Sequence, residues 1–176
     1  MIKLNQPAPD FTANAYQKGL DDNYRQVSLT DYKGKWVVLF FYPRDFTFVC
    51  PTEIEGFQTH YDEFEKANCE ILAASTDTIQ SHRAWFEQDL KNVAFPILED
   101  PSHRITRAYE ILDEENGIAE RGTFIISPEG NIKYFVVSDG NVGRSVTETL
   151  RVVQALQTGG LCPIDWQPGD KQLSPK

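Results

Sequence analysis

The sequence predicts an α/β protein in which helices cover both sides of a central sheet. Strand-like runs rich in β-branched and aromatic residues alternate with segments of helical periodicity. The chain has 176 residues, of which 40% are hydrophobic. That length and composition fit one domain with a substantial core.

Four runs are expected to form buried strands, since each is rich in valine, isoleucine, leucine and aromatic residues. They are WVVLFFY (36–42), EILAAST (70–76), GTFIIS (122–127) and IKYFVV (132–137). Two polar segments are expected to be turns that connect such elements, namely the acidic DEENG (113–117) and PEGN (128–131).

Two helical patterns follow the first strands. One has apolar residues in 3-4-3 spacing, which places them on one face of a single helix: Ile54, Phe57, Tyr61 and Phe64. The other is TIQSHRAWFEQDLK (78–91), which Asp77 is expected to cap, with Gln80 at the N3 position.

Two further helices are expected in the second half of the chain. Asp100 followed by Pro101 is expected to open one that continues to about Leu112. The last begins at Ser145, where SVTE forms a capping box, and the glycines at 159–160 end it. A proline-rich tail, LCPIDWQPGDKQLSPK, follows at 161–176, so we divide the chain into a domain of residues 1–160 and this tail.

The charge balance excludes some partners. The formal net charge is −9 and the sequence pI is near 4.8, which argues against nucleic acid or a membrane as partner, because both require a basic face. The start MIKLNQPAPDF shows no secretory signal, and no apolar run approaches the ~20 residues of a membrane helix. The cytoplasm is therefore the expected location.

In the cytoplasm, three cysteines are not expected to form a structural disulfide framework. Cys69 opens a strand and is expected to be a small buried hydrophobic residue. Cys50 precedes Pro51, a residue favoured at the first helical position, so Cys50 is expected at a helix N-cap. There the free N–H groups and the helix dipole favour a thiolate, although a simple buried cap remains an alternative. Cys162 lies in the tail and is a candidate resolving thiol.

No motif indicates a metal or an organic cofactor. His60, His82 and His103 occur singly, without the HExxH spacing of a metal site. The sequence also lacks GxGxxG, a Walker loop, a GxSxG elbow and a CxxC pair.

Four segments carry a resemblance to a known family. PRDFTFVC (43–50) resembles the active-site loop of peroxiredoxins, and RGTFIISPEG (121–130) resembles the strand that bears their active-site arginine. VGRSVTETLRVVQALQ (142–157) with LCPIDWQPG (161–169) is similar to the last helix and resolving-cysteine tail of typical 2-Cys peroxiredoxins. These include the thioredoxin peroxidases and the bacterial alkyl hydroperoxide reductase C-type proteins. The resemblance implies a thioredoxin-like fold, with a central mixed β-sheet flanked by helices.

The resemblance also implies roles at the site. Cys50 would attack a hydroperoxide and become a sulfenic acid. Thr47 would accept the peroxide proton and support the thiolate, Arg121 would stabilise the transition state, and Pro43 would screen the sulfur from water. Two charged positions, Glu53 and Arg144, would orient the arginine, or they are simply surface charges.

In such a family Cys162 comes from the other subunit of a homodimer and forms an intersubunit disulfide with Cys50. A thioredoxin-like protein or a flavoprotein disulfide reductase then reduces this disulfide, and five dimers commonly assemble into a decameric ring. Such an enzyme serves antioxidant defence and needs no cofactor or metal, because sulfur does the redox chemistry. Alternatives are a 1-Cys peroxidase in which Cys162 is incidental, and a holdase chaperone or redox-relay scaffold.

Overall fold

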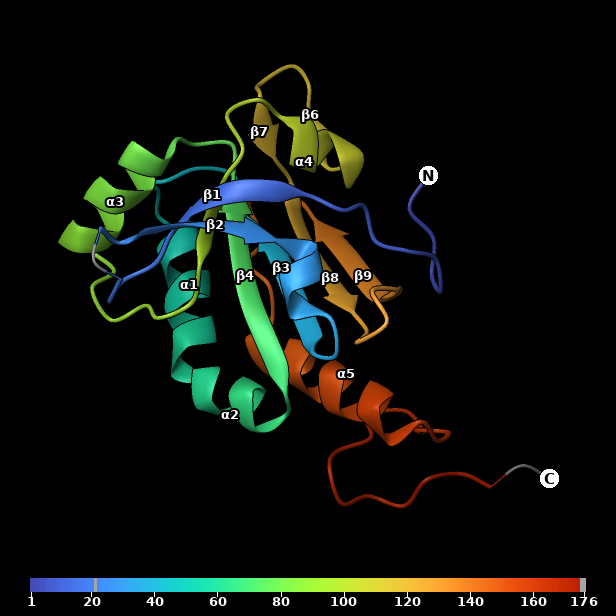
Figure 1. Ribbon diagram of the computed structural model, residues 1–176. Helices are drawn as coiled ribbons and strands as arrows, with labels where there is room; N and C mark the ends of the chain where they lie inside the picture. Colours follow the sequence, from blue (N-terminus) through green and yellow to red (C-terminus); the bar gives the residue numbers. More distant parts are fainter. Residues whose placement is uncertain (21, 175–176) are drawn as a thin grey trace.

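A computed structural model describes residues 1–20 and 22–174 and confirms a central mixed sheet flanked by helices (Figure 1). The sheet has seven strands in the order β2-β1-β5-β4-β3-β8-β9. Strands β3, β4 and β5 are parallel to one another, and the other pairs are antiparallel. The strand bounds are β1 Thr12–Tyr16, β2 Tyr24–Ser28, β3 Trp36–Phe41, β4 Cys69–Ser75, β5 Ile97–Glu99, β8 Arg121–Ile126 and β9 Ile132–Ser138.

Helices cover both faces of this sheet. One face packs against α1, α2, α3 and α5, and the other against the 3₁₀ helix η1 and α4. Each face of the sheet forms a separate hydrophobic core with its helices. Strand β3 contributes to both cores, because Val38 and Phe40 point to the first face while Leu39 and Phe41 point to the second. The helix bounds are η1 Leu29–Tyr32, α1 Cys50–Thr59, α2 Tyr61–Lys66, α3 Ile79–Gln88, α4 Arg104–Ala108 and α5 Val146–Thr158.

The four predicted strands correspond to β3, β4, β8 and β9, with ends that differ by one residue at most. The DEENG segment is the turn of a small hairpin, formed by β6 (Leu112–Asp113) and β7 (Ile118–Ala119), and PEGN connects β8 to β9. Strands β1, β2 and β5 were not predicted. The first two have five residues each and mix buried with exposed positions, and the third has three residues, so none presents a long continuous apolar run.

The prediction of a single helix from Ile54 to Phe64 is wrong, because the structure has two helices there. Helix α1 ends at Thr59 and α2 begins at Tyr61, because His60 has φ −99° and ψ 9°. Ile54 and Phe64 are nevertheless both fully buried in the core that faces α5.

Asp77 does not cap α3. Thr78 is the N-cap, and its hydroxyl accepts a 3.3 Å hydrogen bond from the Ser81 backbone N–H. The Asp77 carboxylate instead accepts bonds from the Asp45 N–H at 2.9 Å and from the Ser75 hydroxyl at 2.8 Å. The helix also ends at Gln88, three residues earlier than expected.

Asp100 does not open a long helix either. Its buried carboxylate accepts bonds of 2.8 and 2.9 Å from the backbone N–H and the hydroxyl of Thr106. Between these two residues, His103 has a positive φ of 58° and delays the start of α4 to Arg104. Leu112, expected at the helix end, lies in strand β6.

The position predicted for α5 is confirmed, but only half of the predicted capping box forms, because both Glu148 carboxylate oxygens accept hydrogen bonds from Arg151. The Ser145 hydroxyl accepts a 3.2 Å bond from the Glu148 N–H, and Gly159 ends the helix with φ 65°. Within residues 1–20 and 22–174, no helix is long and apolar enough to cross a membrane.

Candidate active site around Cys50

Cys50 is the first residue of α1, and its side chain is fully buried. The expectation that Cys50 is the N-cap is wrong by one residue, because Val49 occupies that position. The thiol therefore lies in the first helical turn. There the positive end of the helix dipole favours negative charge.

Arg121, at the start of β8, brings a cation to this sulfur. Its Nη1 donates to Cys50 Sγ at 3.5 Å and to Glu53 Oε2 at 2.6 Å. Its Nε donates to the Gly140 carbonyl at 2.9 Å. The side chain is 4% exposed, so these three partners hold the guanidinium in one orientation with little competition from water.

Arg144 binds the same carboxylate from the segment before α5. Its backbone N–H and its Nε donate to Glu53 Oε1 at 2.9 and 3.0 Å. Its guanidinium lies over the Phe40 ring, 5.0 Å from the centroid. Burial lowers the pKa of Arg144, although the Glu53 carboxylate opposes this shift. Glu53 and Arg144 are thus buried, and the alternative that they are surface charges is wrong.

The buried cluster of Arg121, Arg144 and Glu53 has an unbalanced charge. Two guanidinium groups and one carboxylate leave one net positive charge beside the Cys50 sulfur. Charges are expensive to bury unless they are compensated. A thiolate at Cys50 would neutralise the cluster, which makes this a suitable environment for an anionic sulfur.

The loop of residues 43–49 leads from β3 to Cys50. Pro43 is half-buried at its start, and Thr47 is half-buried three residues before the cysteine. The Thr47 hydroxyl donates to the Arg44 carbonyl at 3.0 Å. The described hydrogen bonds of this threonine therefore stay within the loop and do not include the Cys50 sulfur.

A buried polar network fixes this loop. Asp45 Oδ2 lies 2.8 Å from His82 Nδ1 and accepts a 2.8 Å bond from the Ser81 hydroxyl, while Oδ1 accepts a 2.8 Å bond from the Tyr42 hydroxyl. On its other side, His82 Nε2 lies 3.1 Å from the Leu98 carbonyl. Sequence reasoning missed this pair, because the two residues are 37 positions apart and belong to no motif.

Cys162 lies at the opposite end of α5. Its sulfur is 3.5 Å from the Thr158 hydroxyl and 3.8 Å from the Ala155 carbonyl. The stretch from Arg144 to Ala155 spans ~16 Å at about 1.5 Å per helical residue. A disulfide requires Cα atoms within about 7 Å, so the chain in this conformation does not bring Cys162 to Cys50.

Cys69 fits the expected packing role. Its side chain is 1% exposed in the core between the sheet and α5. Burial raises the pKa of this thiol, and the nearby Glu70 charge adds to the rise. Cys50, Cys69 and Cys162 are all free thiols.

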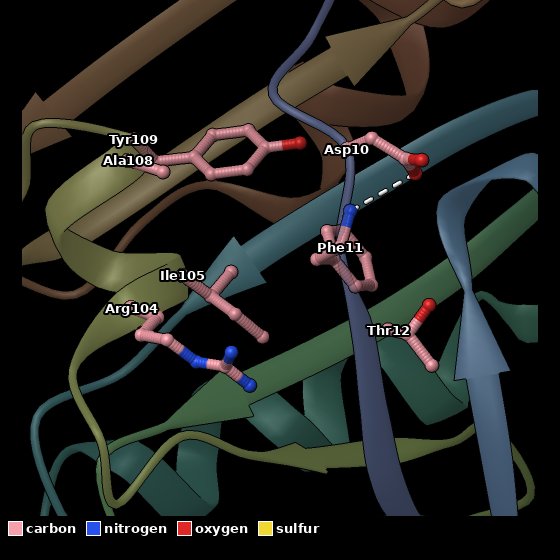
Figure 2. Close-up of a pocket in the computed structure, with 7 residues that line it drawn as sticks. All are labelled: Asp10, Phe11, Thr12, Arg104, Ile105, Ala108 and Tyr109. Carbon is pink, nitrogen blue, oxygen red and sulfur yellow. Dashed lines mark hydrogen bonds between the residues drawn. The ribbon is translucent and has the colours of Figure 1, made fainter.

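Figure 2 shows a pocket of about 360 Å³ that lies elsewhere in the molecule. It is bounded by the segment Asp10 to Thr12, by α4 and by Tyr109. Its lining residues include neither Cys50 nor any member of the buried cluster of Arg121, Arg144 and Glu53. In the part of the chain that the structure describes, no group of three or more His, Cys, Asp or Glu residues could hold a metal ion.

A family model described as "AhpC/TSA family" matches residues 4–135. The chain belongs to this family. The matched residues include Cys50 and Arg121, whereas Cys162 lies beyond them.

Individual relatives extend the likeness over nearly the whole chain. This protein is 48% identical to peroxiredoxin prdx-2 of Caenorhabditis elegans, in an alignment of 181 residues that covers 98% of this chain and 89% of that protein. It is 46% identical over 180 residues to a thioredoxin peroxidase of Trypanosoma brucei rhodesiense, covering 97% of this chain and 89% of that protein. The reduced 2-Cys peroxiredoxin of Plasmodium vivax has a TM-score of 0.91 at 34% identity, over 98% of this chain and 93% of the other. The predicted resemblance is confirmed: the protein is a peroxiredoxin enzyme with a thioredoxin-like fold.

Proposed function

We propose that this peroxiredoxin reduces hydrogen peroxide and organic hydroperoxides with Cys50 as the nucleophile. The thiolate attacks the terminal peroxide oxygen, the O–O bond breaks, and the leaving oxygen takes up a proton to depart as water or an alcohol. Cys50 becomes a sulfenic acid. The observation that carries the proposal is the 3.5 Å contact from Arg121 Nη1 to the sulfur. The same cation can stabilise the charge that develops on the leaving oxygen.

Thr47 and Pro43 are assigned supporting roles in this step. The Thr47 hydroxyl donates its own proton to the Arg44 carbonyl, so lone pairs on Oγ1 remain free to accept the peroxide proton. Pro43 restricts the loop backbone and is proposed to screen the sulfur from water. The Asp45–His82 pair supports both roles, because it anchors the loop that carries these residues.

Cys162 is proposed to resolve the sulfenic acid on a partner subunit, with an intersubunit Cys50–Cys162 disulfide as the product. The separation of the two thiols along α5 supports a partner chain as the source of the second sulfur. The proposed tail of residues 161–176 would then be a separate functional unit from the domain of residues 1–160. Residues 175–176 lie outside the described part of the chain.

Two exposed apolar surfaces support assembly into a homodimer and then a decameric ring. The first is on β9, the last strand of the sheet, where Phe135, Val136 and Val137 are 39, 41 and 46% exposed. An unpaired sheet edge with such residues is suited to pairing with a second chain. The second is on the active-site loop, where Phe46 and Phe48 are 53 and 95% exposed. Two separate apolar surfaces permit one kind of contact within a dimer and another between dimers.

A thioredoxin-like protein or a flavoprotein disulfide reductase is the proposed reductant, and antioxidant defence in the cytoplasm the proposed setting. The first reductant agrees with the name of the trypanosomal relative, a thioredoxin peroxidase. We propose that no cofactor takes part, because the thiols of Cys50 and Cys162 supply both electrons of the peroxide reduction.

The test is peroxide-dependent oxidation of NADPH in the presence of thioredoxin and thioredoxin reductase, run with hydrogen peroxide and with cumene hydroperoxide. Wild type should turn over both, Cys50→Ser should turn over neither, and Cys69→Ala should retain activity because this residue is remote from the charged cluster. Equal activity of Cys50→Ser and wild type would exclude the mechanism. Inactive wild type together with protection of unfolding clients by Cys50→Ser would favour a holdase.

A further inference from the structure

The tail beyond α5 is folded back on itself. The Leu173 N–H donates to the Leu161 carbonyl at 2.8 Å and closes the intervening residues into a loop. Within this loop Trp166 is 5% exposed, and its indole N–H donates to the Asp170 carbonyl at 3.1 Å. Cys162 is therefore part of an ordered loop and is not carried by a free end.

Arg151 connects α5 to this loop. Its Nη1 donates to the Trp166 carbonyl at 3.1 Å, and its Nε and Nη2 donate to the two Glu148 oxygens at 2.6 and 2.8 Å. A bidentate carboxylate fixes the plane of a guanidinium, so the remaining nitrogen is aimed at the tail. Arg151 and Cys162 also line one cavity of about 510 Å³, together with Tyr134 from β9.

We propose that Arg151 is a positioning residue for Cys162, which holds the tail on α5 and keeps a cation beside the resolving sulfur. The proposal rests on the resolving role assigned to Cys162 above. In that step the Cys162 thiolate attacks the sulfur of the Cys50 sulfenic acid, an S–S bond forms, the S–O bond breaks, and hydroxide leaves and takes up a proton as water. Only the thiolate is the nucleophile, so a nearby cation increases the reactive fraction.

Other groups that titrate surround this pair. Hydrogen bonds to Glu148 raise the pKa of Arg151, and the charges of Asp165 and Cys162 add to the rise. The guanidinium thus stays charged over the pH range in which cysteine thiols ordinarily ionise. The negative charges of Glu148 and Asp165 act in the opposite direction and disfavour a thiolate at Cys162. Burial raises the pKa of Tyr134, the group contributed by β9, so this phenol stays neutral in the same pH range.

The test is the alkylation rate of Cys162 as a function of pH in the Cys50→Ser protein, with iodoacetamide as the probe and peptide mass spectrometry as the readout. Arg151→Met should raise the midpoint of the rate–pH profile by about half a pH unit. Arg151→Lys should restore most of that shift. Arg83→Met is the matched control, because it removes an exposed arginine–glutamate pair from α3, and it should leave the midpoint unchanged.

Asp165→Asn gives a second test with the opposite sign, since it removes a negative charge near Arg151 and leaves the Arg151–Glu148 pair intact, and it should lower the midpoint. Faster alkylation of Arg151→Met at every pH, with an unchanged midpoint, would show that Arg151 is only a tether and would overturn the proposal. A midpoint that rises in Asp165→Asn would also overturn it. The assay contains no peroxide, so its result is independent of the peroxidase mechanism: a missing Cys50–Cys162 disulfide would remove the resolving role without abolishing the midpoint shifts.

Discussion

Glu53 Oε2 accepts a 2.6 Å hydrogen bond from Arg121 Nη1, the nitrogen that also reaches the Cys50 sulfur. Because Glu53 and Cys50 share the first turn of α1, the helix that carries the thiol also carries the group that orients its cation. The same carboxylate binds Arg144 next to α5. One buried side chain therefore ties α1 to β8 and to the last helix.

Glu53→Gln should both slow the peroxide step and destabilise the fold, because it leaves the two buried guanidinium groups of Arg121 and Arg144 without the carboxylate that they share. Breaking a buried ion pair costs about 3–5 kcal/mol, and we expect a loss near the lower limit in the free energy of unfolding by urea. The second-order rate constant with peroxide, measured by stopped flow, should fall at least ~10-fold. Glu55→Gln, on the exposed face of the same helix, is the control. Equal effects of the two substitutions would refute this role of Glu53.

Arg121→Met should reduce the peroxide rate constant by ~10²-fold, the usual effect of removing a donor to transition-state charge. The rate constant of Arg121→Lys should lie between those of wild type and Arg121→Met, since lysine keeps the charge but not the planar set of donors. Arg107→Met, which removes an exposed arginine paired with Glu114, should leave the rate unchanged. If Arg121→Met reacts as fast as wild type, Arg121 has no part in the chemistry.

Cys69 should resist alkylation in the folded protein. Burial raises the pKa of its thiol, so it keeps its proton at about pH 8.5, where an ordinary cysteine is half ionised. Cys162 is only partly buried and should react with iodoacetamide before Cys69 does at this pH. Cys69 should be modified only after unfolding in guanidinium chloride. Comparable labelling of both residues in the native protein, read by mass spectrometry, would contradict the buried environment of Cys69.

Strands β3, β4 and β8 could be predicted because they lie inside the sheet and consist of nearly continuous apolar residues. Strand β9 lies at the edge, but its sequence is rich in β-branched and aromatic residues and was predicted for that reason. Strands β1 and β2 could not, since each has only five residues and mixes buried apolar side chains with exposed polar ones. Two helix starts were misplaced for another reason. The carboxylates of Asp77 and Asp100 bind groups brought to them by the tertiary fold, the Asp45 N–H and Thr106 respectively, and local sequence carries no sign of these partners.

In the site, too, some residues could be predicted from the local sequence, whereas others are revealed only by the tertiary fold. Cys50 could be singled out because Pro51 marks a helix start, and Arg121 because its segment resembles a known strand. The contact of His82 with Asp45 could not be predicted, because only the packing of α3 against the active-site loop brings the two together. The family resemblance singled out Glu53 and Arg144, but it left open whether they are buried or on the surface, and only the fold shows that their side chains are buried.

The pairing of Cys50 with Cys162 of a second chain is tested most directly by treating the reduced protein with one equivalent of hydrogen peroxide and mapping its disulfides. We expect a dimer band on a non-reducing gel, with a cross-linked peptide that joins Cys50 to Cys162. Cys50→Ser and Cys162→Ser should each abolish the band, and Cys69→Ala should retain it. A dimer joined through Cys69, or one that persists in Cys162→Ser, would contradict the proposed catalytic cycle.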